Sequence, residues 1–286
     1  MAQFRMVAID LDGTLLSPDG SVSPRNKAAV RRVLEAGLLV CFATGRNWTE
    51  SVTVLDAVEH YSTAVFVGGA MVIDTKAGKT LHRQRVDPQL AREVCQALHS
   101  LGHAALVLQD TGSAGADYLV QRGAALNEAT SQWMVATSAK VHEVDDLSTW
   151  PHEHTVRLGI CAGHDETGRV RDVLKAQFGE RVLCQSLYVS AYEVEVLEVF
   201  DPAVNKWQGI LHVAEAHGVK PEQIVAIGDD VNDLPMIQNA GLGVAMGNAR
   251  PEVLAIAKRI IKSNREDGLA EFLEELVSQH LVEPER

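Results

Sequence analysis

Two carboxylates stand close together near the start of the chain, in the segment Asp10-Leu11-Asp12-Gly13-Thr14. The apolar residues Met6–Ile9 before them predict a buried strand, and in an extended chain residues i and i+2 share a face. Two like charges held this close cost free energy unless a cation or a shared proton relieves them. We therefore expect a cation, most simply Mg²⁺, at the end of this strand.

The same two carboxylates suit phosphoryl transfer through an aspartyl-phosphate. Asp10 would attack phosphorus as the nucleophile, and Asp12 would give a proton to the leaving oxygen. Gly13 would permit a tight turn that brings backbone N–H groups toward the phosphate. A surface Asx-turn or a fragment of a calcium-binding loop is the alternative interpretation of this segment.

Two further segments carry groups that would contact an anion. Thr44-Gly45-Arg46 is expected to follow a strand and open a helix, and a hydroxyl with backbone N–H groups at a helix N-terminus binds anions. Lys206, near the start of a later helix, would neutralise the nucleophile and the transferred phosphoryl group. Taken alone, each segment has a simpler explanation as a helix cap or a solvated surface residue.

Acidic and amide side chains crowd the segment Gly228-Asp229-Asp230-Val231-Asn232-Asp233, which ends an apolar run. Acids near a helix N-terminus complement the helix dipole, which is the simpler interpretation. One aspartate would be enough for that purpose. Several oxygen donors that face Asp10 and Asp12 would instead make a site for Mg²⁺, and we expect this arrangement.

Apolar strands alternate with helices at both ends of the chain. This pattern is typical of a parallel sheet covered by helices on both faces, which is an α/β fold of the doubly wound type. In such sheets ligands bind at the carboxyl ends of the strands, and the loops at Asp10, Thr44 and Asp229 all follow predicted strands. The strands expected at the two ends of the chain are Met6–Ile9, Leu38–Ala43, Ala64–Val67, Glu193–Phe200, Ile224–Ile227, Gly243–Met246 and Arg259–Ile261.

The middle of the chain has a different pattern. A hairpin is expected around Ala77-Gly78, followed by strands and helices too widely spaced for simple crossovers. We expect an α+β domain over residues 84–189, inserted into a core made of residues 1–83 and 190–286. Because the candidate catalytic groups all lie outside the insertion, we expect it to act as a cap.

Composition narrows the range of partners. The 286 residues carry a formal net charge of −12, which argues against nucleic acid and anionic membrane surfaces because both require an excess of Lys and Arg. No segment approaches the ~20 apolar residues of a membrane span. The four cysteines are scattered, which favours reduced thiols and a cytoplasmic protein. The oligomeric state cannot be predicted from the sequence.

Together and in this order, the four polar segments resemble the haloacid dehalogenase-like (HAD) phosphotransferase superfamily. The α+β insertion after the third strand is similar to the type IIB branch, the Cof-type phosphatases. The resemblance covers both core segments. Over residues 84–189 it concerns only the position of the insertion and its α+β pattern of strands and helices. Three further stretches also look like Cof-type signatures: Leu197–Lys206, Gly243–Ala249 and Lys262–Leu269.

The resemblance implies a Rossmann-like HAD core with an inserted cap, and a role for each matching residue. It implies Asp10 as nucleophile and Mg²⁺ ligand, and Asp12 as a general acid and base whose backbone carbonyl also binds Mg²⁺. Thr44 and Lys206 would be the catalytic groups that hold and neutralise the phosphoryl group. The other implied roles are substrate binding for Thr44, Gly45, Arg46, Gly68, Gly69, Lys206 and Asn232, and metal binding for Asp229 and Asp233.

The chain departs from the family pattern at two places. It has Gly68-Gly69-Ala70 where relatives usually carry Asn-Gly-Ala, which bears on a substrate contact. Trp207 follows the lysine where relatives usually have glycine, which would crowd the pocket.

We expect a Mg²⁺-dependent phosphomonoesterase acting on a small phosphorylated metabolite, such as a sugar phosphate. A phosphomutase on the same scaffold and a non-catalytic ligand-binding protein are the alternatives.

Overall fold

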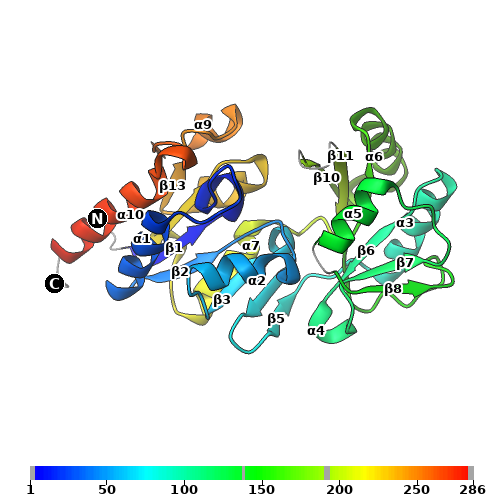
Figure 1. The fold of residues 1–286 in the computed structure, drawn as a ribbon, viewed down its shortest axis with the longest axis horizontal. Helices are drawn as coiled ribbons and strands as arrows, with labels where there is room; N and C mark the ends of the chain where they lie inside the picture. The colour runs from blue at the N-terminus through cyan, green and yellow to red at the C-terminus, as the bar shows by residue number, and fades with distance from the viewer. Residues whose placement is uncertain (1–3, 137–138, 190–193, 283–286) are drawn as a thin grey trace. The chain divides into compact units, whose positions relative to one another are not determined.

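The computed structural model describes residues 4–136, 139–189 and 194–282. The chain divides into two compact units, and the second is inserted into the first (Figure 1). Residues up to 82 and residues from 205 onward form the first unit, which we call the core unit. Residues 83–204 form the second, which we call the inserted unit.

A five-stranded parallel sheet lies at the centre of the core unit. Its central strands are apolar throughout and buried, as expected for a sheet covered on both faces. The predicted doubly wound α/β fold is therefore confirmed. In spatial order the strands are β14 (Arg259–Ile260), β13 (Leu242–Ala245), β12 (Ile224–Gly228), β1 (Met6–Ile9) and β2 (Leu39–Phe42).

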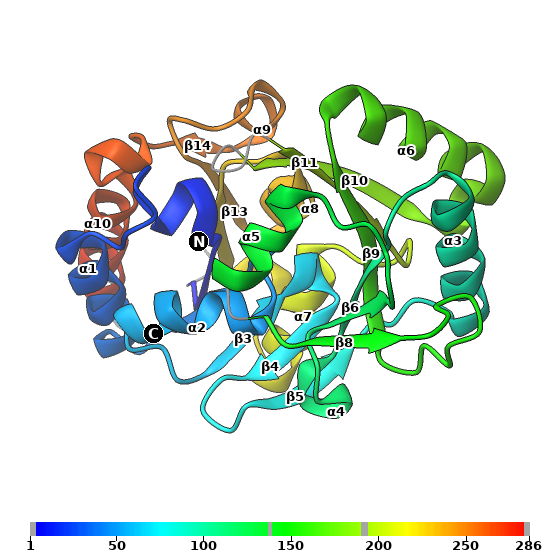
Figure 2. The same cartoon turned by 45° about the vertical axis from the view of Figure 1, so that its right-hand side comes forward.

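Helices cover both faces of this sheet. On one side, α1 (Pro24–Glu35) packs beside α10 (Gly268–Val282) (Figure 2). On the other, α7 (Lys206–Ala216) and α8 (Leu234–Asn239) bury apolar side chains against the strands, together with α9 (Pro251–Ile256). The remaining helix of the core unit, α2 (Trp48–Ala57), begins with a capping box between Asn47 and Glu50.

A small sheet extends the core unit beyond β2. It has the order β3 (Thr63–Phe66), β4 (Met71–Asp74) and β5 (Lys79–Arg83), and β3 and β4 are antiparallel. A parallel bridge between Ala43 and Val65 joins β3 to the residue after β2. The expected third strand is thus present, but most of its pairing is with β4.

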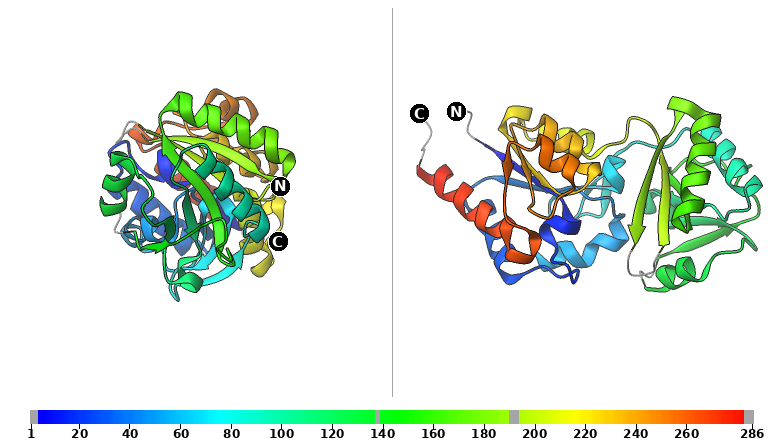
Figure 3. Two further views of the ribbon diagram at one scale, coloured as in Figure 1. Left: turned by 90° about the vertical axis from the view of Figure 1, so that its right-hand side faces the viewer. Right: turned by 90° about the horizontal axis from the view of Figure 1, so that it is seen from above.

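The inserted unit contains a six-stranded mixed sheet with α3 (Pro88–Ser100) and α6 (His164–Phe178) packed on one face (Figure 3). Two shorter helices, α4 (Thr111–Ala114) and α5 (Glu128–Ala136), complete it. The α+β character expected for this region is confirmed. In spatial order the strands are β10 (Leu183–Val189), β11 (Val194–Phe200), β9 (Thr155–Ala162), β6 (Leu106–Gln109), β7 (Tyr118–Gln121) and β8 (Val141–Val144).

The second boundary of the inserted unit differs from the expected one. We placed it at residue 190, so that β11 would belong to the parallel core. Instead β11 pairs antiparallel with both β9 and β10, and the unit ends at residue 204. The sequence of β11, in which Glu195 and Glu198 interrupt the apolar residues, does not reveal which of the two sheets the strand joins.

No helix in the described ranges is long and apolar enough to cross a membrane.

Candidate active site

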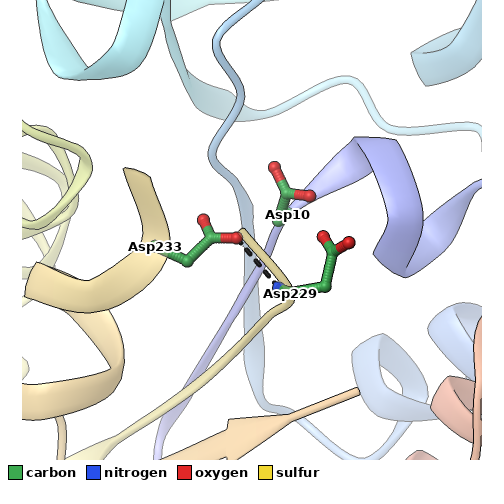
Figure 4. A group of neighbouring side chains, drawn as sticks. All are labelled: Asp10, Asp229 and Asp233. Carbon is green, nitrogen blue, oxygen red and sulfur yellow. Dashed lines mark hydrogen bonds between the residues drawn. The ribbon is translucent and has the colours of Figure 1, made fainter. Parts of the chain in front are cut away.

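Three buried or half-buried carboxylates meet where β1 and β12 end (Figure 4). Asp10 follows β1, whereas Asp229 and Asp233 follow β12, and the two strands are parallel neighbours that pair Ile9 with Ile227. Because the strands end side by side, their loops emerge at the same edge of the sheet. One oxygen from each carboxylate lies within 4.8 Å of the others.

A buried lysine joins two of these carboxylates. Lys206 Nζ donates hydrogen bonds to Asp10 Oδ1 and Asp233 Oδ1, both at 2.6 Å. The lysine is 1% exposed. It stands at the first position of α7, and Asn205 caps that helix by accepting a hydrogen bond from the backbone N–H of Gln208. The start of α7 therefore places the lysine beside Asp10, as the sequence interpretation expects.

The loop after β12 is built to hold Asp233 inward. Asp233 Oδ2 accepts hydrogen bonds from the backbone N–H groups of Asp229 (3.0 Å) and Asp230 (3.1 Å). Its other oxygen faces Lys206, so this carboxylate is almost fully engaged within the protein. Asp229, by contrast, presents its carboxylate toward Asp10 (Figure 4).

Burial and mutual repulsion perturb the ionisation of these groups. Burial raises the pKa of Asp10 above its ordinary value; Lys206 opposes this effect, whereas the neighbouring carboxylates reinforce it. Burial and the charges of Asp233 and Asp230 raise the pKa of Asp229 to about 7. Burial disfavours the charge on Lys206, but Asp10 and Asp233 outweigh it, so the pKa of the lysine is raised.

One lysine does not balance three carboxylates, so the site has excess negative charge when all three are ionised. Hard oxygen donors from three aspartates are the ligand type that Mg²⁺ prefers. The donor set therefore fits a divalent cation, held by Asp10 and Asp229 with Asp233 beside them.

Asp12 lies apart from this trio. Its carboxylate accepts two hydrogen bonds from the Arg46 guanidinium, at 2.8 Å from Nε and 2.6 Å from Nη2. The Asp12 side chain is 56% exposed. The side chain is therefore free of the metal cluster, and the metal role implied for Asp12 concerns its backbone carbonyl.

The loop with Thr44 is braced by the residues after β3. The backbone N–H of Gly68 donates to Thr44 O, and that of Val67 donates to Arg46 O, both at 2.9 Å. Val67, Gly68 and Gly69 all have positive φ values, of 54°, 64° and 109°. A β-branched residue in this region is strained, and such strain is typical of functional loops.

Gly69 brings this loop against the start of α7. A Cβ atom at Gly69 would lie 2.0 Å from the carbonyl oxygen of Asn205, so only glycine fits. The Gly68 conformation lies in the left-handed region that both Gly and Asn tolerate. The departure from Asn at this position thus preserves a backbone that either residue can adopt.

Trp207 does not crowd the lysine. Its side chain is 7% exposed and packs in the apolar cluster under the sheet, with Cys41 and Val65 among its members. Gly209 takes the tight position instead, since a Cβ atom there would lie 2.4 Å from Val65 Cγ1. The expected crowding is therefore wrong, because the tryptophan points into the core.

Asn232 lies over the Thr44 loop. A Cβ atom at Gly45 would be 3.7 Å from Asn232 Nδ2. The Asn232 Oδ1 atom is buried and has no hydrogen-bond partner within the described ranges. This placement brings the predicted substrate-binding residues Gly45 and Asn232 together.

Three asparagines that contact the loop after β1 had no role in our sequence interpretation. Asn26 Nδ2 donates to Leu15 O (2.9 Å), Asn264 Nδ2 to Leu16 O (2.8 Å) and Asn248 Nδ2 to Gly13 O (2.9 Å). Two of them, Asn248 and Asn264, lie in stretches that look like family signatures. The family resemblance of these two stretches was a signal in the sequence, but their contacts with the loop after β1 could not be predicted from it.

At the strand ends of this parallel sheet, carboxylates gather around a buried lysine. Residues 7–273 match the family model of the haloacid dehalogenase-like hydrolases. The chain belongs to this family, and it is a phosphatase of the family.

Individual proteins are similar to the chain over most of its length, in sequence or in fold. The chain is 29% identical to an HMP-PP phosphatase of Citrobacter koseri over 252 residues, which cover 88% of this chain and 87% of the relative. Its fold is similar to that of a haloacid dehalogenase-like hydrolase from Bacteroides thetaiotaomicron, with a TM-score of 0.80, 23% identity and coverage of 96% and 100%. It is also similar to a HAD subclass IIB sugar phosphatase, with a TM-score of 0.76, 17% identity and coverage of 95% and 98%.

Proposed function

We propose that the protein is a Mg²⁺-dependent phosphomonoesterase that hydrolyses a small phosphorylated metabolite through an aspartyl-phosphate at Asp10. The observation that carries this proposal is the Lys206 ammonium held 2.6 Å from Asp10, with Asp229 beside it. A buried carboxylate at a strand end, flanked by one fixed cation and by ligands for a second, is suited to attack a phosphate dianion.

The residues divide the chemistry as follows. An oxygen of Asp10 attacks phosphorus, and the bond from phosphorus to the ester oxygen breaks. The leaving oxygen takes a proton from the Asp12 carboxyl group. Water then attacks the phosphorus of the aspartyl-phosphate and gives a proton to Asp12. The bond from phosphorus to the Asp10 oxygen breaks, so phosphate is released and Asp10 is restored. Thr44 and Lys206 hold and neutralise the phosphoryl group during both steps.

Asp10, Asp229 and the backbone carbonyl of Asp12 would hold Mg²⁺, with Asp233 beside them. When bound, the ion offsets the negative charge shared by the carboxylates and the phosphoryl group. Arg46, which is hydrogen-bonded to Asp12, carries a positive charge that would attract a substrate phosphate. Release of Arg46 onto the substrate would free Asp12 to take up its proton.

The substrate belongs to the class that the relatives' names indicate. One relative is an HMP-PP phosphatase and another a sugar phosphatase, and both names describe small phosphorylated molecules. We propose that the inserted unit serves as a cap that selects among such esters. Four free cysteines suit a reducing compartment, which supports a cytoplasmic location.

Trapping of the intermediate tests this function. Wild-type protein mixed with a phosphate ester and Mg²⁺ and then quenched in acid is expected to carry one phosphoryl group, located at Asp10 by mass spectrometry. Asp10→Asn is expected to lose at least ~10³-fold in turnover, because an amide cannot form the acyl phosphate. A phosphate-release screen over phosphorylated metabolites would identify the substrate, and release of phosphate distinguishes hydrolysis from mutase activity.

Removal of the metal gives a second test. EDTA is expected to abolish turnover, and Mg²⁺ to restore it. Calcium is expected to inhibit, because it prefers a larger and looser oxygen shell than Mg²⁺. Full activity in metal-free buffer would contradict the proposal.

A further inference from the structure

Asn248 contacts two of the loops that form the active site. It lies in the turn after β13, and its Nδ2 donates hydrogen bonds to the backbone oxygen of Gly13 at 2.9 Å and to Asp229 Oδ2 at 3.2 Å. Its Oδ1 accepts a hydrogen bond from the backbone N–H of Asn264 at 2.9 Å. The one amide therefore joins the loop after β1, the loop after β12 and the segment before α10.

The orientation of this amide follows from its neighbours. The Gly13 carbonyl can only accept a hydrogen bond, so it must face the NH₂ group of Asn248. The Asn264 N–H can only donate, so it must face the oxygen. Both requirements select the same orientation, which leaves the second N–H of Asn248 directed at Asp229.

The Asp229 carboxylate is fixed from several sides. Thr14 Oγ1 lies 3.3 Å from Asp229 Oδ1, opposite the contact that Asn248 makes with Oδ2. The main chain of Asp229 is held as well, because the backbone N–H of Arg250 donates to the backbone oxygen of Asp229 at 2.8 Å. Gly13 allows this close approach, because a Cβ atom there would lie 2.1 Å from Asp229 Oδ2.

The base of this arrangement is itself anchored. Asn264 is 8% exposed, and its side chain donates to Leu16 O at 2.8 Å. The backbone N–H that orients Asn248 thus belongs to Asn264, whose side chain is hydrogen-bonded to Leu16 in the loop after β1. Asn248 also contacts Gly13 in that loop, so the hydrogen bonds that hold Asn248 beside Asp229 begin and end in the loop after β1.

We propose that Asn248 is a positioning residue of the metal site, which sets the affinity for Mg²⁺ by holding the Asp229 carboxylate before the ion binds. This inference rests on the proposed Mg²⁺-dependent function. A carboxylate free to rotate must be ordered when the metal arrives, whereas one fixed by donors on both oxygens is ready. Partners of this kind typically change metal affinity or activity by ~10–100-fold when they are removed.

Titration calorimetry of the metal-free, full-length protein with Mg²⁺ tests the proposal. Asn248→Ala is expected to raise the Kd for Mg²⁺ by ~10–100-fold. In phosphate-release assays, the Mg²⁺ concentration for half-maximal rate is expected to rise in parallel, while kcat recovers at saturating Mg²⁺. Asn248→Ser keeps a hydroxyl donor on a shorter side chain, and its Kd for Mg²⁺ is expected to lie between those of the wild type and Asn248→Ala.

The matched control is Asn239→Ala. Asn239 is exposed at the end of α8, and its amide donates to Pro235 O within the same helix, so its loss is expected to leave the Kd unchanged. A purely structural role for Asn248 would lower the melting temperature and leave the Kd of the folded protein as in the wild type.

The outcomes separate the two proposals. If wild type binds Mg²⁺ and both Asn248 variants bind it equally well, the positioning role is overturned and the phosphatase mechanism stands. If wild type does not bind Mg²⁺, and turnover does not need it, the proposed metal dependence is overturned and the positioning role with it.

Discussion

Arg46 holds the Asp12 carboxylate through two hydrogen bonds, of 2.8 Å from Nε to Oδ2 and 2.6 Å from Nη2 to Oδ1. Bidentate pairs of this kind are strong and geometrically specific. The proposed proton donor is therefore bound to the group that would also meet the substrate phosphate. Exchange of Arg46 between these two anions would couple arrival of the substrate to release of the acid.

Asp12→Asn should therefore affect some substrates more than others. An alkoxide leaving group needs a proton, whereas p-nitrophenolate leaves readily without one. We expect the variant to lose at least ~10-fold more kcat with a sugar phosphate than with p-nitrophenyl phosphate. Equal losses for the two esters would mean that Asp12 is not the general acid.

Arg46→Lys should show that the fork geometry matters, because lysine cannot make the paired contact. We expect a loss of about 10-fold in kcat/KM with both esters. Arg31→Lys, on the exposed face of α1, serves as the matched control and should retain the wild-type value. Wild-type kinetics in Arg46→Lys would show that the clamp has no part in turnover.

Gly69→Ala should destabilise the core unit far more than a similar change in an open turn. Gly69 and Gly78 both have positive φ, but a Cβ atom at Gly69 would lie 2.0 Å from Asn205 O, whereas none of the atoms around Gly78 is within 4 Å. We expect Gly78→Ala to cost about 1 kcal/mol from backbone strain alone. Gly69→Ala should cost at least ~2 kcal/mol more, measured by urea unfolding, because Asn205 or the loop must shift. Equal costs would mean that the close approach is not maintained in solution.

Stability should fall as the solution is acidified below neutral pH, partly through His60. This side chain is 2% exposed and packs edge-on against Phe42, and burial lowers its pKa to about 4. A histidine whose folded pKa lies below the unfolded value of 6.5 contributes fully above pH 6.5, and that contribution is lost as the pH falls through about 4. The loss amounts to about 3 kcal/mol.

The contribution of His60 is tested by the slope of the free energy of unfolding against pH between pH 6.5 and about 4. His60→Gln should flatten the slope, since glutamine does not titrate. His217→Gln, at an exposed position after α7, should leave the slope unchanged. Identical slopes in all three proteins would show that His60 does not carry the effect.

Exchange of the inserted unit should change substrate preference. Replacement of residues 83–204 by the corresponding unit of a relative should alter the order in which phosphate esters are preferred, and leave the dependence on Mg²⁺ unchanged. This follows because the carboxylate trio and Lys206 lie entirely in the core unit. If the hybrid keeps the original ranking, specificity resides in the core unit, near Gly68 and Arg46.

The segments of Asp10 and Asp229 could be predicted because each is a local pattern of polar residues after an apolar strand. Lys206 stands near the start of a helix instead, and it was predicted from its context and the family resemblance. The structure brings the three residues together. The pairing of Asp12 with Arg46 could not be predicted, because it depends on how two loops from adjacent strands approach one another. The same holds for Asn248, whose partners lie more than two hundred residues away or on another loop.

The fold of the core unit was predictable for a related reason. Buried parallel strands such as β1 and β12 are uninterrupted apolar runs, which stand out in the sequence. The strands β8 and β10, at the two edges of the inserted sheet, could not be predicted from the sequence. Val141–Val144 is largely exposed, and β10 mixes polar and apolar residues, so neither has the pattern of a buried strand.

The insertion also dictates an order of events during synthesis. Lys206 and Asp10 are 196 positions apart, and β1 pairs with β12 across a similar distance. The inserted unit is continuous in sequence and can fold as soon as it has left the ribosome. The parallel sheet cannot, because β1 keeps an unpaired edge until β12 emerges, and such an edge invites aggregation. Truncated chains that end before residue 224 therefore lack β12 and, with it, the carboxylates of Asp229 and Asp233.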